Sequence, residues 1–474
     1  MIEDFERCYR AAAAKDARFD GWFITGVTST GIYCRPSCHA ITPKRSNVKF
    51  FATPAAAQAA GLRACKRCRP DASPGSPEWN TRGDLVARAM RLISDGMVER
   101  EGVSGLARRL HFSERHLNRQ VTEELGAGPQ AIARAHRAQA ARTLVETTRL
   151  DLGEIAFAAG FGSIRQFNDT IREVLGATPS DLRAKSAPSN GVTNGRLCLR
   201  LPRREPFDGQ GLFDFFARRA VAGMEHVSDG SYRRTLKLPY GHATVELGLE
   251  ADHVACTLQL ADVRDLPAAV ERCRALLDLD ADPQAIDEAL REDRLLRKLV
   301  RATPGRRVPG TVDGFELACR TILGQQVSLG AARTLAGRLA EKYGDRVAAG
   351  DLRRTWPSPA TVAEADLTGF GIAPRRAASL RRLADRVARE EIRIDAGADR
   401  DETEEQLLEI DGIGSWTASY IRMRALRDPD VFLPNDLGVR RALKRLGIEG
   451  KPAHIAARWR PWRSYALQYL WTLA

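Results

Sequence analysis

Four cysteines near the N-terminus have the spacing of a metal site. Cys34 and Cys38 are separated by three residues, Cys65 and Cys68 by two, and 26 residues lie between the pairs. Thiolates that hold zinc in proteins occur in this way, as closely spaced pairs that folding brings together. The sequence therefore predicts one Zn²⁺ bound by four cysteines. The metal either only stabilises the fold or also keeps a thiolate deprotonated and reactive at neutral pH.

A glycine-containing turn near the C-terminus suits contact with a phosphate. Gly412 and Gly414 stand between helical stretches, and their missing side chains let backbone amides approach a phosphate. We predict a helix-hairpin-helix motif in which Gly412, Gly414 and Ser415 bind the DNA backbone, with a monovalent cation on the loop carbonyls. Asp436 lies 24 residues after Gly412, directly before a helix. On the residues alone, Asp436 is either only the N-cap of that helix or also a functional carboxylate.

The charge of the chain indicates a polyanionic partner. The formal net charge is +13, and nucleic acid is the first candidate for such a protein. An apolar run of membrane-span length and an apolar signal core are both missing, so we expect no membrane association and a cytoplasmic, nucleoid-associated protein. A reducing compartment disfavours disulfides. We expect the five scattered cysteines to be buried, inert thiols: Cys8, Cys198, Cys256, Cys273 and Cys319.

The elements that position these residues fall into several domains, because 474 residues are too many for one core. Two stretches rich in Pro, Ser and Gly, at 70–77 and 185–191, are predicted linkers. The sequence between them has a helical pattern. Alternating strands follow at 243–247 and 255–260, and from about residue 284 the chain is again helical in pattern.

Two segments in the helical middle have the pattern of a helix-turn-helix. In residues 105–120 a short apolar-faced helix meets a turn, and Ser113 suits the N-cap of a second helix. Residues 152–168 form a second copy. One copy is weak evidence, because plain helical hairpins share the pattern, but two copies indicate DNA binding. The candidate contacts to bases or phosphates are Arg115, Asn118, Arg165 and Gln166.

The N-terminal motifs carry a resemblance to a known family. Residues 30–38 and 64–71 closely resemble the N-terminal domain of the Ada DNA-repair regulators, and the resemblance covers residues 1–72. It implies that Cys34 is both a zinc ligand and the acceptor of a methyl group from a methylphosphotriester in DNA. The other three cysteines complete the tetrahedron. The transfer is stoichiometric, because nothing in the chain regenerates the cysteine from a thioether.

Residues 82–184 resemble the AraC-type DNA-binding domain, through the run Gly160-Phe161-Gly162-Ser163 and the later run from Gly176 to Ser180. Methylation would remove one negative charge from the zinc site, so the methylated protein should bind DNA more tightly. Together the two resemblances imply a transcription activator that works with RNA polymerase. The guanine-O-alkyl transferase domain usual in the Ada family, with its Pro-Cys-His-Arg site, has no counterpart in this sequence.

From residue 196 to the end, the chain resembles alkylpurine DNA glycosylases of the AlkA type. The matching stretches are 323–328, the hairpin, 431–436 and 459–466. The resemblance implies that Asp436 is the catalytic carboxylate, that Trp416, Tyr420 and Trp471 surround the flipped base, and that Gln326 fills the vacated stack. Without it, aromatic residues four apart on one helix would fit core packing equally well.

The sequence departs from the AlkA pattern at two positions. The AlkA residue at the wedge position is apolar, whereas this chain has Gln326, as some relatives do. Asn435 stands where the family has a second aspartate, which leaves Asp436 as the sole acid of the pair. The turn between Gly414 and Trp416 holds Ser415 and no lysine, whereas lyase relatives carry a lysine near there. We therefore expect a monofunctional glycosylase that leaves an abasic site.

The sequence therefore predicts an adaptive-response DNA alkylation repair protein. It accepts methyl groups, activates repair genes, and excises alkylated purines such as 3-methyladenine from double-stranded DNA, as a monomer. The alternatives are a regulator whose glycosylase-like half only binds damaged DNA, and a structural zinc-and-helix chromatin protein, which would have no use for Asp436. The fold class is multidomain and mainly α, with a small α+β domain. The expected domains are a zinc-thiolate α+β domain (1–75), an AraC-type double helix-turn-helix (81–185), an AlkA-like α+β domain (196–295) and a helix-hairpin-helix glycosylase domain (296–474).

Overall fold

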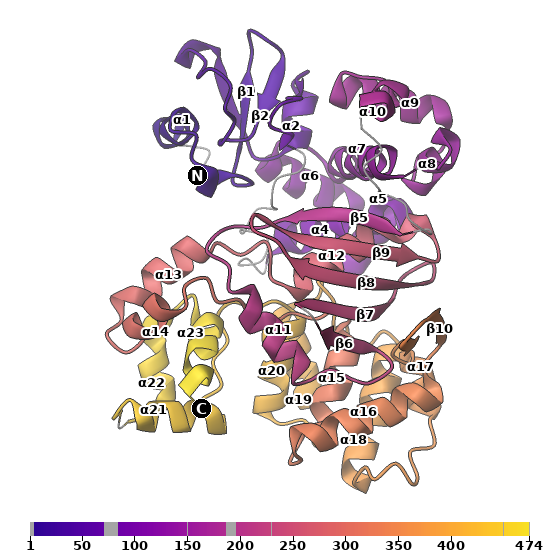
Figure 1. The fold of residues 1–474 in the computed structure, drawn as a ribbon, viewed down its shortest axis with the longest axis vertical. Coiled ribbons are helices and arrows are strands. Elements are labelled where there is room, and N and C mark those ends of the chain that lie inside the picture. Colours follow the sequence, from indigo (N-terminus) through magenta and orange to yellow (C-terminus); the bar gives the residue numbers. More distant parts are fainter. Residues whose placement is uncertain are drawn as a thin grey trace. The chain divides into compact units, whose positions relative to one another are not determined.

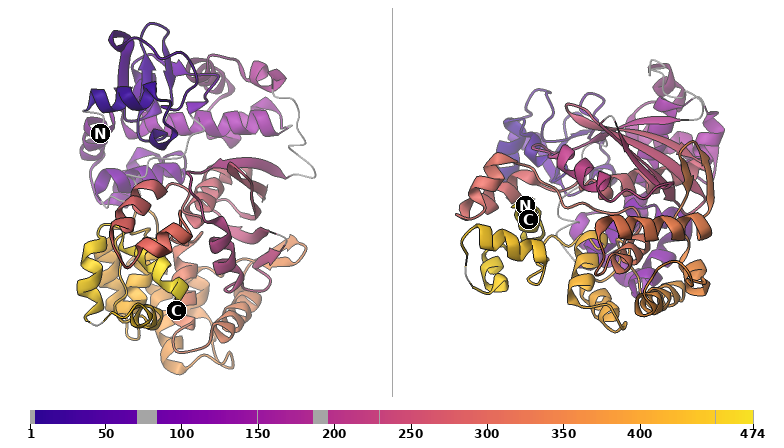
Figure 2. Two further views of the ribbon diagram at one scale, coloured as in Figure 1. Left: turned by 60° about the vertical axis from the view of Figure 1, so that its left-hand side comes forward. Right: turned by 60° about the horizontal axis from the view of Figure 1, so that its bottom comes forward.

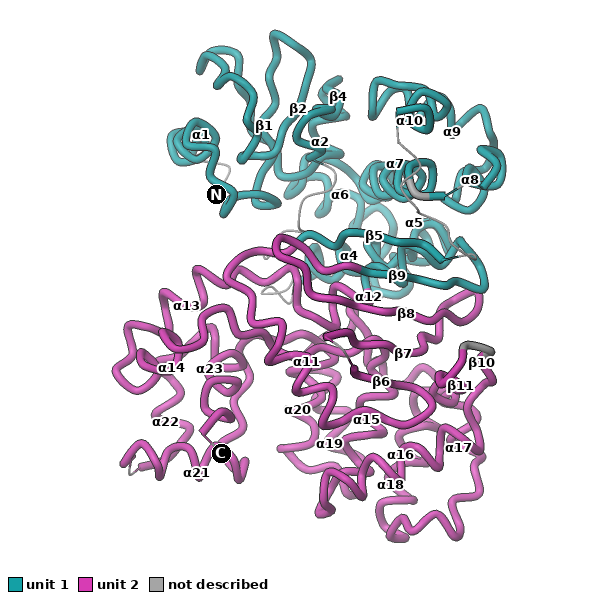
Figure 3. The backbone as a smooth tube through the Cα atoms, in the orientation of Figure 1, with its two compact units in different colours: residues 1–202, 256–271 teal, residues 203–255, 272–474 magenta. Residues whose placement is uncertain are grey.

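The computed structural model describes residues 4–70, 84–185 except Arg149, and 196–473 except Asp229 and Glu449. Most of both predicted linkers, at 70–77 and 185–191, lies outside the described residues. The chain forms two compact units (Figure 3): one contains residues 1–202 and 256–271, and the other contains 203–255 and 272–474.

The first unit begins with a four-stranded sheet in the order β3-β1-β2-β4. Strand β1 is antiparallel to β2 and to β3, and β2 pairs in parallel with the very short β4, in the register Tyr33 to Ala64. Because each of these residues directly precedes a cysteine, the pairing brings Cys34 beside Cys65. The bounds are α1 Phe5–Ala13, β1 Ile24–Val27, β2 Ile32–Cys34, β3 Val48–Phe51, α2 Pro54–Ala59 and β4 Arg63–Ala64.

In the part of the first unit that the structure describes, seven helices follow (Figure 1), and they contain both predicted helix-turn-helix copies, α5–α6 and α8–α9. Ser113 and Ser163 cap the second helix of each copy by accepting backbone N–H groups, and α5 is broken at Gly102, where φ is 71°. Ala55 and Ala56 of α2 pack into the core of these helices. The bounds are α4 Leu85–Ser94, α5 Met97–Leu110, α6 Glu114–Leu125, α7 Pro129–Thr147, α8 Leu152–Ala158, α9 Ile164–Leu175 and α10 Pro179–Lys185.

Strands appear where alternating residues predicted them. Strand β8 (His242–Leu249) covers the predicted segment 243–247, and β9 (His253–Leu260) covers the predicted segment 255–260. Strand β5 (Leu197–Pro202) pairs with β9. In the second unit, β6 (Glu225–Ser228), β7 (Ser231–Lys237) and β8 form an antiparallel meander. Cys198 on β5 is exposed, so the expectation of a buried thiol is wrong there, because its side chain lies on the outer face of the strand.

The rest of the second unit is helical, apart from a small hairpin of β10 and β11. The sequence predicted helical structure from about residue 284 and did not predict this hairpin. Helix α12, Leu266–Leu276, begins in the first unit and ends in the second. The bounds of the other elements are α11 Gly209–Ala217, α13 Pro283–Glu292, α14 Arg297–Ala302, α15 Gly314–Leu323, α16 Leu329–Tyr343, β10 Arg346–Ala349, β11 Leu352–Arg354, α17 Pro359–Glu364, α18 Pro374–Ala388, α19 Arg400–Leu408, α20 Ser415–Ala425, α21 Leu437–Arg445, α22 Pro452–Ala456 and α23 Arg463–Leu470.

These helices pack into two apolar cores within the second unit. One core holds side chains of α15 to α20, and the other holds side chains of α13, α14 and α21 to α23. Figure 2 shows the second group, with α21–α23 in yellow beside α13 and α14. Tyr420 on α20 packs against both cores, so α20 joins them. Within the described residues, no helix is long and apolar enough to cross a membrane.

Candidate functional site

The four predicted cysteines form one cluster in the first unit. Their sulfur atoms all lie within 4.8 Å of one another, and the residues are only 6–9% exposed. In a tetrahedral site with Zn–S bonds of about 2.3 Å, sulfurs are about 3.8 Å apart. The cluster therefore has the composition and the size of a four-thiolate zinc site.

Hydrogen bonding within the cluster favours a mixed protonation state. The hydrogen bond with Cys34 lowers the pKa of Cys68 to about 6, and the same hydrogen bond, with burial, raises the pKa of Cys34. Backbone N–H groups of Arg35 and Ala40 also donate to the Cys68 and Cys38 sulfurs. Crowded thiolates of this kind are stabilised by a divalent cation in place of protons. The residues present thus fit zinc.

Polar contacts anchor both cysteine-bearing segments. Asp20 is buried and accepts the backbone N–H and the hydroxyl of Ser37, at 3.0 and 2.6 Å, which fixes the loop between Cys34 and Cys38. On the other segment, Lys66 Nζ donates to the carbonyl of Gly176 at the end of α9, at 2.9 Å. Arg69 donates to Glu146 on α7 at 2.6 Å. The segment that carries Cys65 and Cys68 is therefore docked on the helix-turn-helix helices.

The four candidate DNA contacts of the helix-turn-helix copies all have exposed side chains. Arg115 and Asn118 lie on α6, and Arg165 and Gln166 lie in the first turn of α9. Gln166 Oε1 accepts the backbone N–H of Gly162 at 3.0 Å, so its amide is already oriented. The two pairs belong to corresponding helices of the two copies, as the sequence predicted.

The hairpin of the second unit has the expected backbone. Gly412 has φ of 89°, and a Cβ there would lie 2.3 Å from the Ser379 hydroxyl on α18, so only glycine fits. Gly414 is the N-cap of α20, and Ser415 is exposed in the first turn. Free N–H groups at this helix start can bind a phosphate. Gln325 ties the preceding loop to the hairpin, because its amide donates to the carbonyl of Gly412 at 2.9 Å.

Gln326, in the wedge position, is exposed and has a positive φ of 55°. Arg376 on α18 donates to the carbonyls of Leu323 and Gln325 on either side of Gly324, at 3.1 and 3.2 Å. The loop between α15 and α16 is thus held on its inner side, while Gln326 projects into solvent.

Asp436 is the N-cap of α21, as its position predicted, and it also holds two aromatic residues. Oδ1 accepts the backbone N–H of Val439 and the indole N–H of Trp471, both at 2.9 Å. Oδ2 accepts the indole N–H of Trp416 at 3.0 Å. A carboxylate offers about four lone-pair sites, so Oδ2 retains one that accepts no hydrogen bond from the residues that the structure describes.

The predicted aromatic residues meet beside this carboxylate. Trp416 stacks on Tyr420, with ring centroids 5.0 Å apart and planes 10° apart, and Tyr420 lies 6.5 Å from Trp471. Arg424 donates to the Tyr420 hydroxyl at 2.8 Å. Burial raises the pKa of Tyr420, but Arg424 and Arg219 more than offset this, and the pKa lies below its ordinary value.

These groups line a cavity of about 840 Å³, within the size range of small-molecule sites. Sequence reasoning missed most of its lining residues, among them Phe215 and Arg219 from the α11 region and Arg424 on α20. The Arg219 guanidinium lies 3.7 Å from the Phe215 ring centroid and that of Arg424 lies 4.8 Å from it. The aromatic run Phe213-Asp214-Phe215-Phe216 was the available signal, but core packing explains it equally well.

Four family models match successive parts of the chain. The metal binding domain of Ada matches residues 7–71, and a helix-turn-helix domain matches residues 106–185. The AlkA N-terminal domain matches residues 198–313, and the HhH-GPD superfamily of base excision DNA repair proteins matches residues 319–463.

Individual relatives agree with these matches. The "Probable bifunctional transcriptional activator/DNA repair enzyme AlkA" of Mycobacterium tuberculosis is 53% identical over 480 residues, which cover the whole chain and 97% of the relative. DNA-3-methyladenine glycosylase 2 of Escherichia coli is 34% identical over 56% of the chain and 94% of its own length. Among solved structures, the 3-methyladenine DNA glycosylase of Archaeoglobus fulgidus superposes with a TM-score of 0.51 and 25% identity, over 58% of this chain and 97% of that one.

The family models and the match over the full length together place an Ada-type metal binding domain, a helix-turn-helix domain and AlkA-type glycosylase domains in one chain. They set aside a structural chromatin protein. The chain belongs to the family of bifunctional transcriptional activator and DNA repair enzymes that join an Ada-type zinc domain to an AlkA-type glycosylase.

Proposed function

We propose that the second unit hydrolyses the N-glycosidic bond of alkylated purines, with Asp436 as the catalytic carboxylate. The observation that carries this proposal is the arrangement of Asp436, whose carboxylate is held by two indole N–H groups in the wall of the cavity. A helix cap alone needs neither indole. The hairpin binds the backbone of double-stranded DNA, and Gln326 occupies the space that the flipped base leaves.

The reaction follows from the groups in the cavity. The bond between the sugar C1′ and the base nitrogen breaks, its electron pair leaves with the base, and the sugar develops oxocarbenium character. The negative charge of Asp436 stabilises that cation, in the way that preorganised charges stabilise other transition states. The free lone pair of Oδ2 orients a water, whose oxygen bonds to C1′ and whose proton is released. Alkylation makes the base a good leaving group and a cation that aromatic faces such as Trp416 and Tyr420 attract.

We propose that the enzyme has no lyase activity. A lyase needs an amine that forms a Schiff base with the sugar. Ser415 occupies the turn between Gly414 and Trp416, near which lyase relatives carry a lysine, and no lysine lines the cavity in the described part of the chain. Incubation with DNA that contains 3-methyladenine should therefore release the free base and leave an unbroken strand with an abasic site. Strand cleavage without added base would contradict this assignment.

We further propose that Cys34 accepts a methyl group from DNA methylphosphotriesters. Zinc, when bound, keeps the cysteine sulfurs deprotonated at neutral pH. The Cys34 sulfur attacks the methyl carbon, the carbon–oxygen bond breaks, and the phosphodiester leaves with the negative charge. Hydrogen bonds from Arg35 and Ala40 to the Cys68 and Cys38 sulfurs reduce the nucleophilicity of those two and support Cys34. Mass spectrometry of protein treated with methylated DNA locates the methyl group.

The helix-turn-helix copies then read a promoter, and we propose that the protein acts there as a monomer that contacts RNA polymerase at the nucleoid. The competing function is a regulator whose glycosylase-like half only binds damaged DNA. The indole-bound carboxylate favours excision, because binding alone needs no negative charge opposite the sugar. Base release from alkylated DNA separates the two hypotheses, and sedimentation tests the monomer. A monovalent cation on the hairpin carbonyls stays a prediction. It can be tested by measuring DNA affinity in salts of different monovalent cations at equal ionic strength.

A further inference from the structure

The loop that presents Asp436 is anchored far from the carboxylate by a second set of contacts. This 426–436 loop runs from the end of α20 to the start of α21. Asp428, near its beginning, is only 5% exposed. Its carboxylate accepts a hydrogen bond from Arg422 Nε at 2.6 Å. It also accepts the backbone N–H of Asp430, in the same loop, at 2.9 Å. Burial of a carboxylate is costly unless it is paired in this way.

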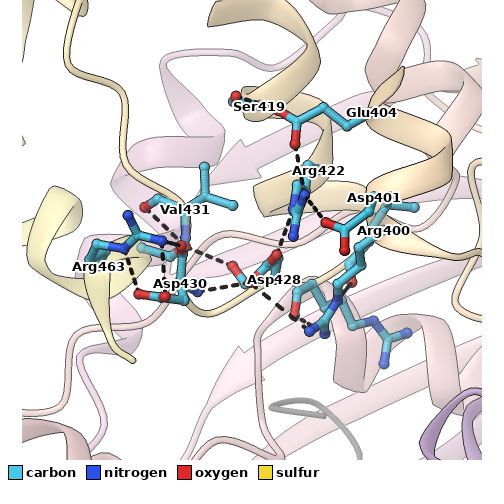
Figure 4. Close-up of polar contacts among 12 residues, drawn as sticks. Arg400, Asp401, Glu404, Ser419, Arg422, Asp428, Asp430, Val431 and Arg463 are labelled. Atoms are coloured by element: carbon cyan, nitrogen blue, oxygen red, sulfur yellow. Dashed lines mark hydrogen bonds and ion pairs between the residues drawn. The ribbon is translucent and has the colours of Figure 1, made fainter. Parts of the chain in front are cut away.

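Arg422 is itself oriented by two further carboxylates. Its Nη1 donates to Asp401 at 2.6 Å and to Glu404 at 2.8 Å, both on α19. Figure 4 shows Arg422 between these carboxylates and Asp428, with Ser419 on the far side of Glu404. The guanidinium therefore joins α19, α20 and the 426–436 loop at one point.

A second anchor comes from the start of α23. Arg463 binds Asp430 with two nitrogen–oxygen contacts, Nε to Oδ1 at 2.6 Å and Nη2 to Oδ2 at 2.9 Å. The Ser464 hydroxyl accepts the N–H of Val431 at 2.9 Å and donates to the carbonyl of Asp428 at 2.6 Å. Two-point arginine–carboxylate pairs fix orientation as well as distance.

The same two helices also hold the far end of the loop. Helix α20 contributes Trp416 to Asp436 and Arg422 to Asp428, while α23 contributes Arg463 to Asp430 and is followed directly by Trp471, which binds Asp436. The loop is thus fixed at its beginning by Arg422 and Arg463 and at its end by two indoles. Arg400 on α19 adds contacts at the beginning, because it donates to the carbonyls of Leu426 and Arg427 at 3.2 and 2.8 Å. A shift of the beginning would carry Asp436 away from the indole N–H groups.

We propose that Arg422 with Asp428 and Arg463 with Asp430 are positioning pairs, which set the Asp436 carboxylate against the sugar of the flipped nucleotide. The proposal rests on the proposed glycosylase function. Catalytic groups must be held within about 0.5 Å of the productive geometry, and a misplacement of about 1 Å can cost up to a hundredfold in rate. None of the four residues lines the cavity, so they act through the loop and not on the base.

The test uses the full chain and DNA that contains 3-methyladenine. In Arg422→Gln and Arg463→Gln, the single-turnover rate of base release should fall about tenfold or more. Affinity for DNA with an abasic-site mimic should stay within about twofold, because the hairpin is unchanged. The indole ¹⁵N–¹H signals of Trp416 and Trp471, assigned with phenylalanine variants, should shift in both. Arg422→Lys keeps the charge and should recover part of the rate.

Arg389→Gln is the matched control, because it removes an arginine from an ion pair with Asp385 on the exposed side of α18, at 3.0 Å. Its rate and its indole signals should equal those of the wild type. A double variant of Arg422→Gln and Asp428→Asn should be no slower than the slower single variant, since the two residues act as one pair.

Wild-type rates with unshifted indole signals in the folded variants would overturn the proposal. An equal loss of rate and of abasic-DNA affinity would overturn it too, because it would indicate general loosening. If Arg422→Gln does not fold, Arg422→Lys and Arg463→Lys carry the same test. A wild-type protein that releases no base would instead contradict the glycosylase function.

Discussion

Asp436→Asn separates the charge of the carboxylate from its other roles. Asparagine keeps the size and can still cap α21, since its amide oxygen can accept Val439 N–H in place of Oδ1. That choice turns the amide NH₂ toward the indole of Trp416, where Oδ2 now accepts at 3.0 Å. Two donors then face each other, and one unsatisfied donor costs about 1–3 kcal/mol of stability.

The effect on excision should be larger than the effect on stability. Removal of a preorganised group that stabilises transition-state charge costs about 3–4 kcal/mol, a factor of about 10²–10³ in rate. We therefore expect single-turnover release of 3-methyladenine to fall by that factor, while affinity for DNA with an abasic-site mimic persists. Thermal unfolding of the second unit should shift downwards.

Two further variants make the result decisive. Adding Trp416→Phe to Asp436→Asn removes the opposed donor, so it should recover thermal stability without recovering the rate. Asn435→Ala changes the exposed neighbour, whose side-chain oxygen accepts Arg440 Nη2 at 3.0 Å, and should cost far less. A folded Asp436→Asn protein that releases base within about threefold of the wild-type rate would refute the electrostatic role, because the loss expected from such a group is a hundredfold or more.

Three other outcomes can be measured on the same protein. Cys34→Ala should abolish methyl transfer from phosphotriesters and leave base release intact, and a methyl group found by mass spectrometry on Cys38 or Cys65 would show that the acceptor is misassigned. Methylated protein should bind its promoter more tightly than unmethylated protein at one fixed salt concentration, because one negative charge is lost, and equal affinities would exclude this switch. Burial raises the pKa of Asp278 to about 6, above its ordinary value of 3.8, so the folded state favours the protonated form. Stability from this group is full below pH 3.8 and is lost as pH rises through 6, by at most about 3 kcal/mol. The stability of Asp278→Asn relative to wild type should therefore increase from pH 4 to pH 7. An equal difference in unfolding free energy between variant and wild type at the two pH values would disprove the pKa shift.

Local patterns in the sequence were sufficient for features that depend on neighbouring residues. The serine caps of both helix-turn-helix copies, the glycine of the hairpin and the N-cap position of Asp436 all follow from residue types within a few positions. The cysteine cluster was predictable because thiolate pairs at such spacing have few other uses. These features are present in the structure as expected.

Contacts between distant residues were not predictable in the same way. Trp416 and Trp471 lie 20 and 35 positions from Asp436, and the sequence carries no signal that their indoles donate to its carboxylate. Phe215 lines the cavity from α11, about two hundred positions before Asp436 in the sequence. The aromatic residues next to it suit core packing as well as they suit a binding site. Cys198 looked like a buried thiol, since periodicity alone did not show which face of β5 is covered.

The docking of the Cys65–Cys68 segment has a consequence for the supply of metal. Strand β4 is only two residues long, so zinc and the contacts of Lys66 and Arg69 hold this segment in place. Structural zinc sites contribute about 10–16 kcal/mol to folding in small domains, so metal occupancy is linked to the integrity of the surface that α7 and α9 share with the segment. In the described residues, this cluster is the one group of four cysteines that could hold a metal, and it belongs to the first unit. Zinc scarcity would thus weaken the packing of this segment against α7 and α9, and α9 belongs to the second helix-turn-helix copy.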